Sequence, residues 1–115
     1  MYTHSQLRSD VGVQELRRTA GLWLKELREK RGLSQRQLAK LVGAEYYTFI
    51  SQLETGRGRI PPDRYREWAG ALQVEPAEFV RTLMKYYDPV THGILFSDAS
   101  SEASAKSVSS EPGGK

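Results

Sequence analysis

One short stretch of the chain combines an apolar anchor with a row of hydrogen-bonding side chains. Ile50 and Leu53 lie at helical spacing, so they would hold one side of a helix against a core. The side chains left on the outer side are Tyr46, Tyr47, Thr48, Ser51 and Gln52. A Gln amide can pair with adenine through two hydrogen bonds, and a Thr methyl can contact the methyl group of thymine. This combination is typical of a helix that enters the major groove of DNA.

Positive charge accompanies this stretch. Arg36 precedes it, and Arg57 and Arg59 follow it in a short Gly-containing loop. Residues 1–60 contain 11 Lys or Arg against 6 Asp or Glu, whereas residues 61–115 contain 6 against 8. An excess confined to one half indicates a surface that meets a polyanion, with an ordinary solvated surface as the alternative.

The composition leaves little material for catalysis. Cys is absent, which excludes disulfides, thiolate metal sites and Cys nucleophiles, and the two histidines are His4 and His92. No nucleophile elbow, phosphate loop or paired carboxylate motif organises the other polar residues. We therefore expect no enzyme, no metal and no cofactor. No apolar run is long enough for a membrane span and no signal peptide is recognisable, so we expect a cytoplasmic protein.

The ends of the chain differ in composition from its middle. Residues 97–115 contain seven Ser and no aromatic residue, so they cannot bury enough apolar surface to offset the entropy of ordering. We expect a disordered tail there and a flexible arm over residues 1–9. The remaining residues, 10–96, are predicted to form one domain.

Helical periodicity runs through that domain. Leu16, Ala20, Trp23, Leu24 and Leu27 recur three or four residues apart. The first expected helix begins at Ser9 or Asp10 and ends before Gly32. The other four cover residues 34–42, 45–55, 62–72 and 76–87. In the second helix Leu38, Leu41 and Val42 are expected to point inward. Only Gly93–Phe96 could be a strand, so the prediction is an all-α, compact five-helix bundle with disordered termini.

Three segments together resemble a known family. SQRQLAKLVG, ISQLETGRGRIP and WAGALQV look like the Cro and phage-repressor type of helix-turn-helix domain, the XRE family, over about residues 20–87. The resemblance implies a repressor-like DNA-binding domain in a bacterial or phage-encoded protein associated with the nucleoid. Gly43 lies seven residues before Ile50, where the family usually has six, so the turn around Ala44 and Glu45 is one residue longer.

The resemblance also implies roles for individual residues. The base-contacting positions fall on Tyr47, Thr48 and Gln52. Contacts with phosphate or the DNA backbone fall on Gln35, Arg36, Tyr46, Ser51, Arg57 and Arg59. Gln35 additionally matches a glutamine that braces the base-contacting helix. For Tyr46, Tyr47 and Phe49 the alternative is a place in the core or a dimer contact, which we favour for Phe49.

A structural ion pair is implied as well, between Arg28 on the first helix and Glu54 at the end of the base-contacting helix. Such a pair would fix how that helix sits on its scaffold.

These features predict a transcriptional regulator that binds double-stranded DNA sequence-specifically, as a homodimeric repressor on an inverted repeat. The residues expected to form the dimer surface are Tyr86, Tyr87, Ile94, Leu95 and Phe96. Burial of these residues against Trp23 and Trp68 of the same chain is the alternative. The alternative function is an antitoxin or anti-activator that binds a protein partner and regulates its own operon.

Overall fold

The computed structural model describes the backbone of residues 4–97 and the side chains of residues 12–96, and every element in this part of the chain is helical. The α-helices are α1 His4–Lys30, α2 Gln35–Leu41, α3 Thr48–Glu54, α4 Tyr65–Leu72, α5 Pro76–Tyr87 and α6 Pro89–His92. A 3₁₀ turn, Pro62–Arg64, leads into α4, and a π-helical turn, Gly93–Ser97, continues α6. The all-α prediction is therefore confirmed, with one more helix than expected.

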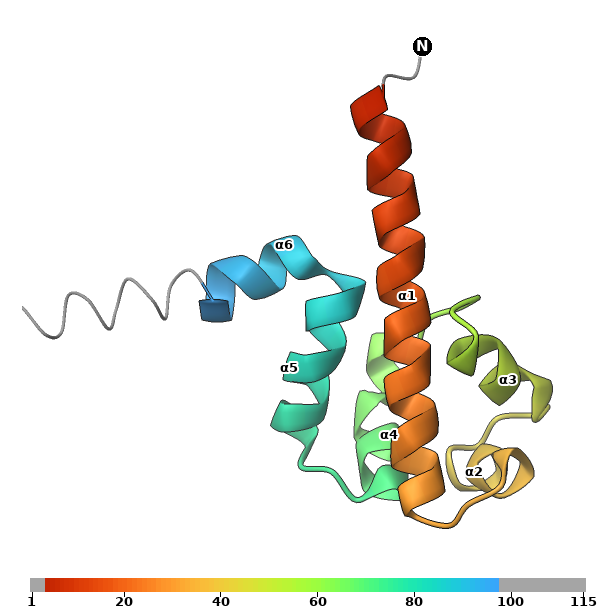
Figure 1. Ribbon diagram of the computed structural model, residues 1–115. Coiled ribbons are helices and arrows are strands. Elements are labelled where there is room, and N and C mark those ends of the chain that lie inside the picture. Colours follow the sequence, from red (N-terminus) through yellow and green to blue (C-terminus); the bar gives the residue numbers. More distant parts are fainter. Residues whose placement is uncertain (1–3, 98–115) are drawn as a thin grey trace, which may run out of the picture.

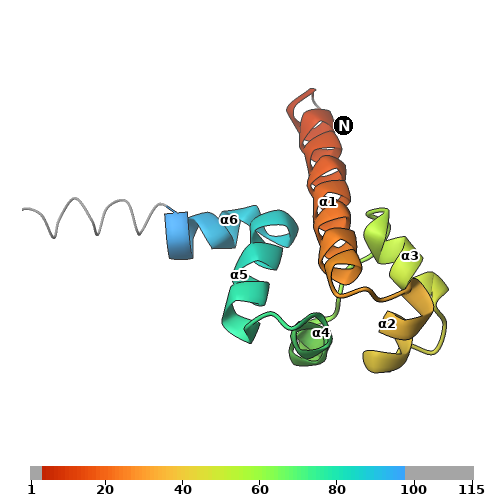
Figure 2. The same ribbon diagram turned by 60° about the horizontal axis from the view of Figure 1, so that its bottom comes forward.

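The long helix α1 is the axis of the structure. α3 packs on one side of it and α5 on the opposite side, and α2 and α4 complete the bundle below (Figures 1 and 2). The buried apolar core draws on α1 to α5 and on the loop before α4. Its members are Ala20, Leu24, Leu38, Ala39, Val42, Ile50, Leu53, Ile60, Trp68, Ala69, Leu72, Phe79, Leu83 and Tyr87.

Glycine lets α3 approach α1 closely. Gly21 is buried in α1, and a Cβ built on it would lie 2.6 Å from the carbonyl oxygen of Leu53 and overlap that of Glu54. A glycine in a helix interior costs about 1 kcal/mol relative to alanine. Here the missing side chain is what allows the two helices to touch, which explains a residue that helix propensity alone disfavours.

Several expected boundaries differ from the structure. α1 begins at His4, so residues 4–9 of the expected arm are helical, and α3 begins at Thr48 instead of residue 45. Gly93–Phe96 is helical and not a strand, because Asp88 caps a new helical turn by accepting a hydrogen bond from the Thr91 N–H at 3.2 Å. α5 has the predicted bounds. Residues 1–3 and the predicted tail beyond Ser97 lie outside the described residues.

Leu41 was predicted to point inward, and this was wrong. Its side chain is 54% exposed at the end of the two-turn helix α2, whereas Leu38 and Ala39 are buried. In so short a helix, only the residues on the side facing α3 and α4 reach the core.

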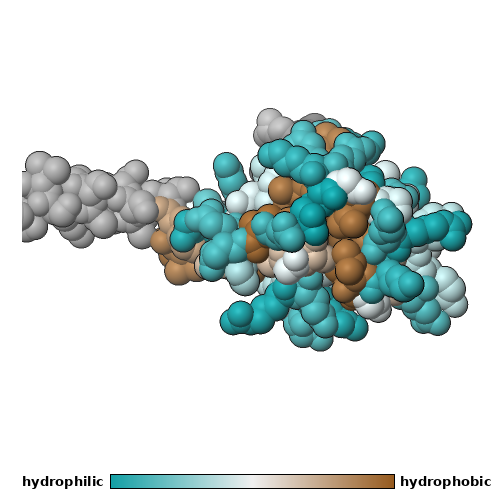
Figure 3. Space-filling model, turned by 90° about the horizontal axis from the view of Figure 1, so that it is seen from below, coloured by the Kyte–Doolittle hydropathy of each residue, from teal (hydrophilic) through white to brown (hydrophobic). Residues whose placement is uncertain are grey.

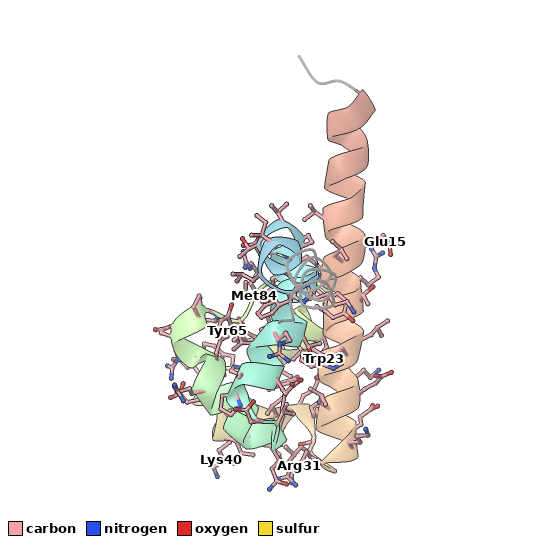
Figure 4. All side chains as sticks on the ribbon, turned by 90° about the vertical axis from the view of Figure 1, so that its left-hand side faces the viewer. Glu15, Trp23, Arg31, Lys40, Tyr65 and Met84 are labelled. Atoms are coloured by element: carbon pink, nitrogen blue, oxygen red, sulfur yellow. The ribbon has the colours of Figure 1, made fainter. Side chains whose placement is uncertain are left out.

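The aromatic pair at the end of α5 folds back onto its own chain. Tyr87 is a core residue, and Tyr86 lies with its ring centroid 6.5 Å from that of Trp23. Figure 4 shows Trp23 between α1 and α5, where it stacks on Phe79 at 5.5 Å. Tyr86 thus contacts Trp23 of its own chain, as the alternative for this pair proposed, whereas Tyr87 is buried in its own chain beside Ile60. A dimer role for Tyr87 does not fit, because it has almost no exposed surface.

Apolar side chains beyond α5 remain exposed. Val90, Ile94 and Leu95 are 72%, 62% and 55% exposed, and brown atoms gather there beside the grey end of the chain in Figure 3. Phe96 is half-buried, with its ring 5.0 Å from that of His92. No helix in the described part of the chain is long and apolar enough to cross a membrane.

Candidate nucleic-acid interface

A capping box begins α2. The Ser34 hydroxyl accepts a hydrogen bond from the Gln37 N–H at 3.0 Å, and the Gln37 side chain accepts one from the Ser34 N–H at 2.8 Å. This reciprocal pair satisfies two backbone donors that have no partner inside the helix. It leaves Gln35 and Arg36 in the first turn of α2, at the end of the helix where backbone N–H groups attract anions.

The turn between α2 and α3 is built around one glycine. Gly43 has a φ of +71°, a left-handed conformation that glycine adopts without strain. After it, the Ala44 N–H donates to the Ala39 carbonyl at 2.9 Å. Residues 45–47 are not helical, and α3 begins at Thr48, where the Phe49 N–H donates to the Tyr46 carbonyl at 3.1 Å and the Ile50 N–H to the Tyr47 carbonyl at 2.9 Å. The longer spacing seen in the sequence is therefore taken up by an extended turn.

A buried ion pair fixes α3 from beneath. The Arg28 Nε donates to Glu54 Oε2 at 2.6 Å and its Nη2 donates to Oε1 at 3.0 Å, and both side chains are less than a tenth exposed. Arg28 Nη1 also donates to the Leu33 carbonyl at 2.8 Å. The hydrogen bond to Glu54 raises the pKa of Arg28 above its already high ordinary value. The pair implied by the resemblance is thus formed, and it joins α1 to the end of α3.

Gln35 completes this arrangement. Its Nε2 donates to Glu54 Oε1 at 3.0 Å, so the carboxylate accepts hydrogen bonds from α1 and from α2. A buried carboxylate held by a two-point guanidinium contact and an amide has little freedom to move. As a result α1, α2 and α3 are locked together at one point.

The outer side of α3 is accessible. Thr48 and Gln52 are exposed, Tyr46 and Tyr47 are 66% and 40% exposed, and Ser51 is half-buried. Phe49 is half-buried and packs against the core, in line with the role favoured for it. Thr48 and Gln52 also line an open hollow of about 440 Å³, together with Tyr46, Phe49 and Arg64.

Arg36 and Tyr47 are brought together across the turn. The Arg36 guanidinium lies 4.3 Å from the centroid of the Tyr47 ring, a cation–π contact between α2 and the residue that precedes α3. Two side chains assigned separately to phosphate and base contact therefore form one unit.

The loop after α3 is held by Tyr87. The Ile60 N–H donates to the Tyr87 hydroxyl at 3.3 Å, and the Arg59 guanidinium lies 4.9 Å from the centroid of the same ring. Burial raises the pKa of Tyr87 above its ordinary value. Arg57 and Arg59 are exposed on this loop. No sequence signal indicated this contact, because Tyr87 lies 27 residues from Ile60 and outside every motif.

Comparison with known proteins agrees with this geometry. Residues 24–79 match the family of helix-turn-helix domains, a span that includes Arg28, Glu54, the α2–α3 turn and the loop after α3. No curated protein matches the chain. The chain therefore carries, over residues 24–79, a DNA-binding helix-turn-helix domain of the XRE family.

Proposed function

We propose that the chain is a sequence-specific regulator of transcription that contacts bases in the major groove through the exposed side of α3. One observation carries this proposal: Glu54 locks α3 to α1 and α2, while Thr48 and Gln52 remain exposed on its other side. Base recognition requires a rigid helix whose exposed side carries adaptable hydrogen-bonding groups.

Contacts with the phosphate backbone are assigned to residues around this helix. Gln35, Arg36, Tyr46, Ser51, Arg57 and Arg59 make up this set. Gln35 has its amide nitrogen engaged by Glu54, so its backbone N–H at the start of α2 is the group offered to phosphate. Arg36, stacked on Tyr47, orients that ring toward the groove as well as adding charge.

We further propose a homodimeric repressor that acts in the cytoplasm on an inverted repeat. The exposed apolar surface of Val90, Ile94 and Leu95 supports self-association, because apolar side chains gathered at one end of a small domain gain from burial by a second copy. Two copies of a helix-turn-helix domain place their helices about 34–36 Å apart, one turn of B-DNA.

The same apolar surface favours one second candidate, an antitoxin or anti-activator that covers a protein partner with it. Sedimentation of the purified chain distinguishes the two candidates by its oligomeric state. A dimer forms from the chain alone at micromolar concentration, whereas a partner-binding protein stays a monomer until the partner is added.

Selection of bound sequences from a pool of random duplex DNA tests the proposal. We expect an enriched, palindromic motif whose half-sites are about 10–10.5 base pairs apart, centre to centre. Recovery of unenriched sequences would contradict sequence-specific binding, and an enriched motif without symmetry would contradict the dimer.

A further inference from the structure

A second basic surface lies beside the loop that follows α3. It is an open hollow of about 510 Å³ between α1 and the C-terminal end of α3. Its lining residues are Val13, Gln14, Arg17, Arg18, Thr55, Gly56 and Arg57. Three of these carry a positive charge and none is acidic. Two of the arginines belong to α1 and precede the span that matches the helix-turn-helix family.

Backbone geometry builds this hollow. Gly56 lies two residues after the end of α3 and has a φ of +83°, and a Cβ on it would lie 2.9 Å from the Cα of Arg18. The chain after α3 therefore runs directly against α1. The Arg57 N–H then donates to the Gln52 carbonyl at 2.8 Å, which keeps Arg57 at the helix end beside α1.

The positive charge in the hollow is poorly compensated. Within the described residues neither Arg17 nor Arg57 forms an ion pair, and the Nε of Arg17 is buried with no hydrogen-bond partner. Arg18 pairs with Glu15 at 2.6 Å, but both side chains are more than half exposed, and an exposed pair of this kind is weak. An oxyanion in the hollow would supply an acceptor for the guanidinium groups of Arg17 and Arg57.

The hollow is continuous with the loop assigned to the DNA backbone. The Tyr87 ring has the Arg17 guanidinium 5.7 Å from its centroid and the Arg59 guanidinium at 4.9 Å. Arg57 lines the hollow and Arg59 follows two residues later, so the arginines of α1 and those of the loop lie in neighbouring parts of the molecule.

We propose that the hollow binds phosphate groups of the DNA backbone next to the site contacted by α3, which makes α1 part of the DNA interface. This inference rests on the proposed function. Guanidinium groups bind phosphate oxygens through two parallel hydrogen bonds, and Arg17, Arg18 and Arg57 offer three such groups at one place. Arg17 and Arg18 are then backbone contacts that the helix-turn-helix motif itself does not contain.

The test compares Arg17→Gln and Arg18→Gln with a matched control, Arg81→Gln. Arg81 pairs with Glu78 on α5 at 3.0 Å and has almost the same exposure as Arg18, but it lies across α1 from α3. Affinity for a short duplex of arbitrary sequence and for a selected duplex is measured between about 50 and 200 mM salt. Thermal melting verifies that each variant is folded.

We expect both α1 variants to bind both duplexes more weakly. The magnitude of the salt slope should fall by about 0.9 for every phosphate group that a variant no longer binds. Between the two ends of this fourfold range of salt concentration, the affinity of such a variant should fall by a factor about threefold smaller than that of the unmodified chain. The Arg81→Gln chain should keep the slope of the unmodified chain.

Three results would overturn the inference, and they are distinguishable. If the unmodified chain binds no duplex, the proposed function fails together with the inference. If it binds DNA but both α1 variants keep its slope, only the inference fails. If inorganic phosphate raises the melting temperature more than chloride at equal ionic strength while the slopes stay unchanged, the hollow binds free anions and not DNA.

Discussion

At the scale of single residues, exposure divides the polar side chains of α3 and its neighbours into two groups. Gln52 and Thr48 are exposed and can meet bases, whereas Gln35 uses its amide nitrogen to bind Glu54. The resemblance implied two roles for Gln35, a contact with phosphate and a contact that braces α3. The hydrogen bond from Gln35 to Glu54 at the end of α3 is a bracing contact.

Gln52 supplies the first prediction. Changing Gln52 to Ala should weaken binding to the selected duplex by about 1–3 kcal/mol and relax the preference at one base position in each half-site, because Ala cannot form two hydrogen bonds with a base. Repeating the selection with the variant measures this. An equal weakening on every sequence would show instead that Gln52 only positions the helix.

At the scale of elements, one buried ion pair and one glycine set the position of α3. The pair of Arg28 and Glu54 ties the end of α3 to α1, and Gly21 allows the two helices to touch. These two devices place the exposed side of α3 relative to the rest of the domain, so both should affect folding before they affect base preference.

Removing one partner of the ion pair tests the first device. Glu54→Ala should lower the free energy of unfolding by about 3–5 kcal/mol, because it leaves the buried Arg28 charge without a partner. Denaturant unfolding measures this. As a control, Glu67→Ala breaks an exposed pair with Arg64 and should leave the free energy of unfolding almost unchanged. If both variants are destabilised by the same small amount, the buried pair does not hold α3.

Gly21→Ala tests the second device. The added Cβ would overlap the Glu54 carbonyl, so α3 must shift, and overpacking of this kind costs about 1–3 kcal/mol. Gly70 in α4 is the matched control, since a Cβ there meets nothing within 4 Å. Gly70→Ala should stabilise the protein by up to about 1 kcal/mol through helix propensity. Equal effects of the two changes, measured by thermal melting, would refute the close packing.

The elements also show what the sequence could and could not predict. The spacing of Phe79 and Leu83 predicted the correct bounds of α5, because helical periodicity is a local signal. Tyr87 was misplaced, since periodicity marks it as apolar without telling whether its own chain or a second copy covers it. Arg17 was missed altogether. It shares the hollow with Arg57 and other residues from the end of α3, and these lie about 40 residues away from Arg17 in the sequence.

At the scale of the whole molecule, recognition and association are assigned to opposite sides of α1. α3 and its loop lie on one side, and α6 with its exposed apolar residues lies beyond α5 on the other (Figure 1). Residues 97–115 carry a net negative charge, so they offer phosphate no attraction and we expect them to be dispensable for DNA binding. Removing them should leave operator affinity nearly unchanged in a direct titration.

The apolar surface supports a sharper prediction. Leu95→Asp should weaken self-association in sedimentation experiments and reduce affinity for a full palindrome far more than for a half-site. Leu22→Asp is the matched control, because Leu22 on α1 is also 55% exposed but lies outside this surface. If both variants sediment like the unmodified chain and bind the palindrome equally well, the dimer surface lies elsewhere.

The central claim is that α3 distinguishes DNA sequences. The most direct measurement is the ratio of the dissociation constants for a shuffled duplex and for the selected duplex, at one salt concentration of about 0.15 M. Specific regulators bind their sites at least about 10³-fold more tightly than other DNA, and we expect such a ratio here. Equal affinity for the two duplexes would contradict sequence recognition by α3.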